Sequence, residues 1–201
     1  MTAVPAVLAL HYQNEVVHAE GRIRVGLAAG DPMRERVIEA ASRLLAGARA
    51  RGWPIVHVRI AFRPDYADCP RNTPIFRRTV ELGAMRDGEW GAEFHEALSP
   101  RPGPREFVVT HTRISAFAGT SLEQTLRMLD CERLLVAGVA THSVVEGSVR
   151  EAADRGFDVW VGADACAAAD AQTHAASLAS MALIATISDV AGLLSSTEGG
   201  P

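Results

Sequence analysis

The sequence has few of the features that mark secreted, membrane-spanning or nucleic-acid-binding proteins. Its three cysteines are an odd number at unrelated spacings, which predicts free thiols and not a disulfide framework. The first apolar stretch ends at His11 and has no basic segment before it, so we expect neither a signal peptide nor a transmembrane helix. A net charge of −4 gives no electrostatic reason to expect nucleic acid or an anionic membrane as partner. These absences make the cytoplasm the expected location.

What is present is the composition of an ordinary globular protein. Hydrophobic residues make up 48% of the chain and charged residues 22%, and 201 residues can bury a sizeable core. No repeat or linker interrupts the chain. We therefore expect one domain over residues 1–201, with residues 195–201 as a flexible tail.

Apolar runs alternate with helical patterns along the chain. Such alternation predicts a three-layer α/β fold with a mostly parallel sheet of five or six strands and helices on both faces. The expected strands are Ala6–Leu10, Ile55–Phe62, Glu106–Thr110, Arg133–Val139 and Phe157–Ala163. The first expected helix follows Asp31 as an N-cap and ends at Gly52. A short helix is expected around Ile75–Leu82 and another over Thr120–Leu129. The next helix begins with Thr141 as a cap, and His174–Leu194 holds the last helix. Residues 63–104 are otherwise irregular, as functional covers often are.

Three of these segments should meet at one edge of the sheet. His11 ends the first strand, His111 follows the third, and Thr141 to Val144 begin the helix after the fourth. In parallel α/β sheets the ligand binds beyond the carboxyl ends of the strands. This edge is therefore the expected site.

The same segments carry a family resemblance. AVLALHYQN, HTRISAFAGTSLEQTL and GVATHSVVEGSVREAADRGF resemble three ordered motifs of the isochorismatase-like cysteine hydrolases, and the similarity spans roughly residues 5–192. The resemblance implies a Rossmann-like sheet, a homo-oligomer, and a cis peptide at Val139–Ala140. It also implies an aspartate, a lysine and a nucleophilic cysteine, at the positions where this chain has His11, His111 and Val144.

The substituted triad changes the chemistry that we expect. A valine has no lone pair with which to attack a carbonyl, so a covalent intermediate at Val144 is excluded. Ser143 lies one residue away, which turns its side chain about a quarter turn around a helix, and helix capping is its simpler role. Cys166 follows the last predicted strand and would support an ordinary amidase, although a packed free thiol is the simpler interpretation.

Two facing histidines would suit acid–base catalysis. Imidazole titrates near neutral pH, so one ring can act as base and the other as acid. Elimination, isomerisation, cyclisation and attack by water need no protein nucleophile. The alternative is that His11 and His111 fill a site that has lost its activity. A zinc site of His11, His111 and His142 is a weaker alternative, because no paired ligand spacing supports it, so we expect no metal or cofactor.

Other polar and aromatic residues near this edge are candidate substrate contacts. They are Gln13, Tyr12, Trp90, Ser115, Thr141, Ser143, Val144 and Glu146. Arg71, Arg77 and Arg113 could meet an anionic substrate, but exposed arginines are common and we assign them no role. The sequence thus predicts an enzyme acting on a small organic molecule, in a setting such as specialised metabolite biosynthesis. The competing hypothesis is an inactive homologue that serves as a ligand-binding or partner subunit.

Overall fold

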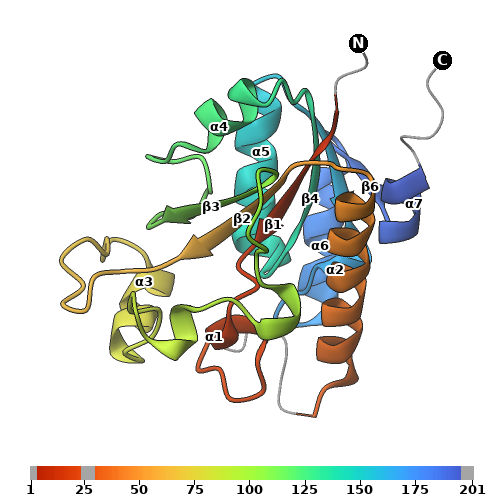
Figure 1. The fold of residues 1–201 in the computed structure, drawn as a ribbon. Helices are drawn as coiled ribbons and strands as arrows, with labels where there is room; N and C mark the ends of the chain where they lie inside the picture. The colour runs from red at the N-terminus through yellow and green to blue at the C-terminus, as the bar shows by residue number, and fades with distance from the viewer. Residues whose placement is uncertain (1–3, 24–29, 196–201) are drawn as a thin grey trace.

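A six-stranded parallel sheet forms the centre of the protein (Figure 1). The structure is a computed structural model that describes residues 4–23 and 30–195. The strand order is β3-β2-β1-β4-β5-β6, and each neighbouring pair is parallel. The strands are β1 (Ala6–Leu10), β2 (Ile55–Ile60), β3 (Glu106–His111), β4 (Arg133–Gly138), β5 (Asp158–Gly162) and β6 (Thr186–Ser188). The predicted α/β class with a mostly parallel sheet is confirmed.

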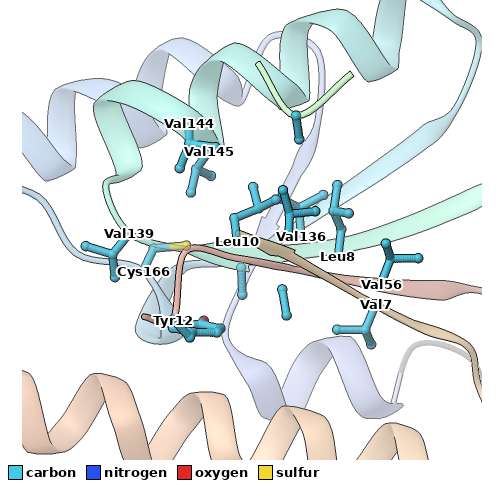
Figure 2. Packing of buried hydrophobic residues seen from close by; sticks show 14 of the residues in the cluster. Val7, Leu8, Leu10, Tyr12, Val56, Val136, Val139, Val144, Val145 and Cys166 are labelled. Carbon is cyan, nitrogen blue, oxygen red and sulfur yellow. The ribbon is translucent and has the colours of Figure 1, made fainter. Parts of the chain in front are cut away.

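The strand β1 lies in the middle of the sheet because its sequence is apolar on both faces. All five residues of AVLAL are buried, as expected for a parallel strand that is covered from both sides. Figure 2 shows Leu8 and Leu10 of β1 packed with Val136 of β4. Gly138 permits the close approach of these two strands, because a Cβ there would lie 2.4 Å from the carbonyl oxygen of Leu10. The order of strands reverses between β1 and β4, so a crevice opens beyond their carboxyl ends.

Helices cover both faces of the sheet. The chain steps toward the β3 edge of the sheet from β1 to β2, but toward the β6 edge from β3 to β4, from β4 to β5 and from β5 to β6. Because such crossovers are right-handed, α2 lies on one face of the sheet, and α4, α5 and α6 lie on the other. The helix α7 packs beside α2 (Figure 1). Their bounds are α2 (Pro32–Ala50), α4 (Leu122–Met128), α5 (Glu146–Asp154), α6 (Ala171–Met181) and α7 (Val190–Ser195). Asp31 caps α2 as predicted, since its side chain accepts a hydrogen bond from the Met33 N–H.

The predicted single helix over His174–Leu194 is wrong. The segment divides into α6, a turn, the short edge strand β6 and α7. The β-branched residues Thr186 and Ile187 extend the sheet beside β5 instead of continuing the helix. Tertiary pairing thus overrides a helical apolar pattern. Ser195 is the last residue of α7, and the rest of the predicted tail lies outside the described residues.

The predicted cap at Thr141 is also wrong. A π-helical turn, Thr141–Val145, precedes α5, and no side chain caps its start. The Thr141 hydroxyl instead lies 2.9 Å from Nδ1 of His174. A π turn inside a helix often marks a functional position.

The long segment between β2 and β3 folds over the carboxyl edge of the sheet. It contains α3 (Pro74–Glu81) and two short 3₁₀ turns (Trp90–Ala92 and Glu96–Leu98), and the one-turn helix α1 (Asn14–Val17) lies against the first of these turns. A third 3₁₀ turn, Ala163–Ala165, follows β5. Among the described residues no helix is long and apolar enough to cross a membrane.

Candidate active site

His11 and His111 meet at the carboxyl edge of the sheet. His111 is the last residue of β3 and His11 follows β1 directly. The two Nε2 atoms are 2.5 Å apart, and the ring planes are tilted by 38°. His11 has a φ of +55°, a left-handed conformation that costs a residue other than glycine roughly 1–2 kcal/mol. This conformation turns the chain out of the strand immediately after Leu10.

Hydrogen bonding assigns a proton to each ring. Nδ1 of His111 lies 3.2 Å from the carbonyl oxygen of Ser115, and a carbonyl can only accept, so this nitrogen carries a hydrogen. In a neutral His111 the Nε2 atom is therefore an acceptor, and Nε2 of His11 must donate to it. This arrangement leaves a lone pair on Nδ1 of His11, which has no hydrogen-bond partner within the described residues. His11 is thus a base whose second nitrogen is already connected to another base.

Burial keeps both rings neutral at pH 7. His11 is 8% exposed and His111 2% exposed. Loss of solvation lowers the pKa of His11 well below 6.5, and repulsion from His111 lowers it further. Loss of solvation also lowers the pKa of His111 to about 4, against the opposing effect of its hydrogen bond to the Ser115 carbonyl. Both rings therefore hold lone pairs at neutral pH, and their lowered pKa values make them weaker bases than a free imidazole.

A pocket opens beside His11. Counted together with space that is open to solvent, it has a volume of about 610 Å³. Its wall is mostly apolar and comes from β2, α3, the segment after β3 and the start of the π turn. Val144 and Ser143 line the pocket beside His11. The Val139–Ala140 peptide at its floor is cis, as the family resemblance implies.

Six of the predicted substrate contacts support this edge without lining the pocket. Gln13 is buried, and its amide donates to the carbonyls of Ile60 and Ala92. The Tyr12 hydroxyl donates to the Ala165 carbonyl, and Figure 2 shows Tyr12 on the α2 side of the sheet, away from Val144. Both residues hold the strand ends in place, because buried polar groups satisfy their hydrogen bonds locally.

The other four of these residues also have partners of their own. Trp90 is 49% exposed and contacts the edge of His18. Thr141 contacts His174, as described above, and Glu146 accepts hydrogen bonds from Ser177 and Arg150. Ser115 acts through its carbonyl, which fixes the tautomer of His111. Of the predicted substrate contacts, only Ser143 and Val144 lie on the pocket wall.

The structure does not favour Cys166 as a nucleophile. It is 2% exposed, does not line the pocket beside His11, and burial raises the pKa of its thiol to about 12. A thiol with such a pKa is almost entirely protonated at neutral pH. His142 lines the pocket but is exposed, and no group of three or more His, Cys, Asp or Glu side chains in the described residues could hold a metal ion.

Sequence reasoning did not assign two parts of the pocket. Arg113 lines it, whereas Arg71 and Arg77 do not. The α3 residues Ile75, Phe76 and Thr79 also line it, and their helical spacing was a usable signal. Which face of α3 meets the sheet edge depends on how the covering segment folds, and sequence spacing does not show that.

The comparisons with known proteins agree with this geometry. A sequence model of the isochorismatase domain matches residues 5–192. The chain belongs to the isochorismatase family. In structure, this family member is similar to an isochorismatase family protein from Desulfovibrio vulgaris, with a TM-score of 0.84, 29% identity, and coverage of 98% of this chain and 100% of the other.

Two relatives in sequence carry functional names. The secreted isochorismatase effector Isc1 of Verticillium dahliae is 34% identical over 158 residues, which are 78% of this chain and 73% of that protein. The ureidoacrylate amidohydrolase RutB of Methylobacterium radiotolerans is 31% identical over 169 residues, which are 77% of this chain and 65% of that protein. The activities in these names are those of the relatives. For this chain the similarity shows membership of the isochorismatase family and no more.

Proposed function

We propose that this protein is an enzyme that acts on a small organic molecule by non-covalent proton transfer through His11 and His111. One observation carries the proposal. His11 has an unused lone pair on Nδ1 beside a pocket, and its Nε2 contacts Nε2 of a second buried histidine. A general base needs a free lone pair near the substrate and an environment that favours its neutral form, and the pair provides both.

Covalent catalysis is not part of the proposal. By the family resemblance, the aspartate, lysine and cysteine positions correspond to His11, His111 and Val144. Val144 lines the pocket with hydrocarbon only, so it cannot form a bond to a carbonyl carbon. The printed sequence contains no lysine at all, so no other position in it can supply that residue. We therefore propose that the triad is replaced by a pair of bases.

The proton moves in two connected steps. Nδ1 of His11 accepts a proton from the substrate, or from a water that attacks it, and the ring becomes a cation. The proton on Nε2 of His11 then passes to Nε2 of His111, so the charge moves to the inner ring. There the Nδ1–H of His111 donates to the Ser115 carbonyl, which stabilises the imidazolium. Reversal of both steps returns the proton to a leaving group or a new carbon position.

This cycle suits several reaction types. Elimination, isomerisation and cyclisation each need one proton removed and one returned, and hydrolysis needs a base that activates water. The relatives named as amidohydrolases make hydrolysis by activated water one of these candidates. We further propose a homo-oligomer in the cytoplasm, as the family resemblance implies, and a role in specialised metabolite biosynthesis.

An inactive homologue remains the alternative function. The observation that favours it is the apolar pocket wall at the position of the family's nucleophile. In that case the histidine pair fills space and the pocket binds a ligand without converting it. The two functions differ in what loss of the pair does to turnover.

The test is turnover by the wild type, His11→Ala and His111→Ala. Each protein is incubated with a panel of small amides, enol ethers, lactones and hydroxy acids, and products are followed by mass spectrometry. Loss of a positioned acid or base should reduce turnover by about 10²–10⁴-fold. His18→Ala is the matched control, because His18 lies outside the pocket wall; it should retain wild-type turnover.

Circular dichroism must show that the variants fold. If both pocket variants convert the substrate as fast as the wild type, the acid–base proposal is wrong. If the wild type binds compounds of the panel but converts none of them, the inactive homologue is the better description.

A further inference from the structure

We infer that the pocket binds a small monocarboxylate with an apolar body, whose carboxylate pairs with Arg113. The inference rests on the proposed function, because it names the substrate class of the same site. It is derived from the charge on the pocket wall, the free donors of one arginine and the apolar surfaces opposite.

Among the described residues, the pocket wall has one positive charge and no negative charge. Fifteen of these residues line the pocket, and none is an aspartate or glutamate. Arg113 is the one with a permanently charged side chain. A cationic substrate would find no carboxylate to pair with in this wall, and an uncharged one would make no use of the arginine. The electrostatics of the wall therefore favour an anion.

Two nitrogen atoms of the Arg113 guanidinium make no hydrogen bond within the described residues. Nη1 donates to the carbonyl oxygen and the hydroxyl of Thr112, at 2.9 and 2.8 Å. No carboxylate in the described residues forms an ion pair with Arg113, and its Nε and Nη2 atoms make no hydrogen bond there. Two other arginines are different, since Arg59 of β2 pairs with Asp87, and Arg86 of the covering segment pairs with Glu89.

The contacts of Thr112 prepare Arg113 for a planar anion. They hold one corner of the guanidinium to the backbone of its own loop. The remaining edge presents parallel N–H groups, which match the two oxygens of a carboxylate. A cation such as an ammonium group would be repelled by the guanidinium.

The rest of the wall suits an apolar body. Ten of the fifteen lining residues are apolar, among them Ile75 and Phe76 of α3, Ile114 beside Arg113, and Val144. Ile75 and Ile114 are 46% and 40% exposed. Covering such apolar surface by a ligand releases water and favours binding. With its carboxylate at Arg113, an apolar body would extend along this wall toward Nδ1 of His11.

Calorimetry with a matched pair of probes tests the inference. The probes are 3-phenylpropanoate and its uncharged amide, 3-phenylpropanamide, which have the same apolar body. The wild type should bind the acid at least tenfold more tightly than the amide. Arg113→Gln should weaken binding of the acid at least tenfold and leave binding of the amide unchanged. Arg77→Gln is the control, because Arg77 is exposed outside the pocket wall; it should bind both probes as the wild type does.

Three outcomes overturn the inference: no binding of the acid to the wild type, equal affinities for acid and amide, or an Arg113→Gln variant that binds the acid as the wild type does. The proposed function fails separately. His11→Ala should still bind 3-phenylpropanoate. If the histidine variants keep turnover while Arg113→Gln loses binding of the acid, the proton-transfer proposal is wrong and the carboxylate site stands.

Discussion

The sheet contains two buried histidine clusters whose chemistry differs. At the carboxyl edge, His11 contacts His111, and no charged group in the described part of the chain holds either ring. Further back on the strands, His57 of β2 lies 2.9 Å from Glu106 of β3, and Glu106 also binds Arg49 of α2. Both clusters are removed from water, but only the second contains its own counter-charges.

The partners decide what each cluster can do. Hydrogen bonds from Arg49, Arg101 and His57 hold the pKa of Glu106 at about 2, against the opposing effect of burial. Burial lowers the pKa of His57, and Glu106 opposes this shift. The Nδ1 atom of His57 is buried without a partner, and His57 lines no part of the pocket. Its lone pair therefore faces protein, whereas His11 lines the pocket.

This difference shows why burial and a shifted pKa do not by themselves identify a catalytic residue. His57 has both properties and joins two strands to a helix. His11 has both properties and also a free nitrogen, a proton-accepting neighbour and space for a ligand. The three predictions that follow test this division between a structural cluster and a chemical one.

The largest effect on stability should come from the structural cluster. Glu106→Gln removes the carboxylate that accepts hydrogen bonds from Arg49, His57 and the Arg101 N–H, and it leaves the Arg49 guanidinium, which is 18% exposed, without its ion-pair partner. Breaking a buried ion pair costs about 3–5 kcal/mol of unfolding free energy. Urea unfolding measures this loss, and turnover of the folded fraction should be unchanged. A stability equal to that of the wild type would show that the cluster is not structural.

Acid should destabilise the two clusters in different pH ranges. The unfolded chain binds a proton at His111 near pH 6.5, but the folded protein binds it only near pH 4, so stability is full above pH 6.5 and falls as the pH falls toward 4. A shift of this size corresponds to roughly 3 kcal/mol. The contribution of Glu106, whose pKa is lowered from 4.5 to about 2, is lost only below pH 4.5.

Unfolding free energies measured from pH 7 to pH 2 test this order. His111→Gln should flatten the curve between pH 6.5 and 4 relative to the wild type. A His111→Gln curve with the same slope as the wild type would contradict the assignment of the buried neutral pair. His18→Ala is the control and should keep the wild-type slope.

The smallest effect on stability should come from Val144→Cys, which changes little volume and costs less than about 1.5 kcal/mol. The introduced thiol would lie on the pocket wall beside His11, whose free lone pair can accept its proton. Iodoacetamide should label it at least tenfold faster than Cys166, which is equally buried but lies outside the pocket wall.

Combining Val144→Cys with His11→Ala distinguishes access of the reagent to the thiol from deprotonation of the thiol by His11. Labelling should then slow at least fivefold at pH 7, because His11 is no longer there to take the thiol proton. Equal labelling rates with and without His11 would mean that this lone pair is not available to the pocket, and the contrast with His57 would fail.

Much of the fold could be predicted from local sequence. The apolar run AVLAL, the Asp31–Pro32 helix start and the strand–helix alternation are local signals, and the structure confirms them. The segment over His174–Leu194 could not be resolved this way, because β6 forms only where β5 offers a partner. Thr141 was misassigned as a cap for the same reason, since its partner His174 is 33 residues away.

The candidate site divides along the same line. The residue types at positions 11, 111 and 144 are fixed by the sequence, and they alone exclude a covalent intermediate at Val144 and require a base of another kind. Tertiary structure decided that the rings of His11 and His111 touch, that the Ser115 carbonyl sets their protons, and that Arg113 faces the pocket while Tyr12 does not. The physical reason is that the type of a side chain fixes which chemical bonds it can form. Its solvation, its hydrogen-bond partners and the direction in which it points depend on segments that are as far apart in the sequence as His11 and His111.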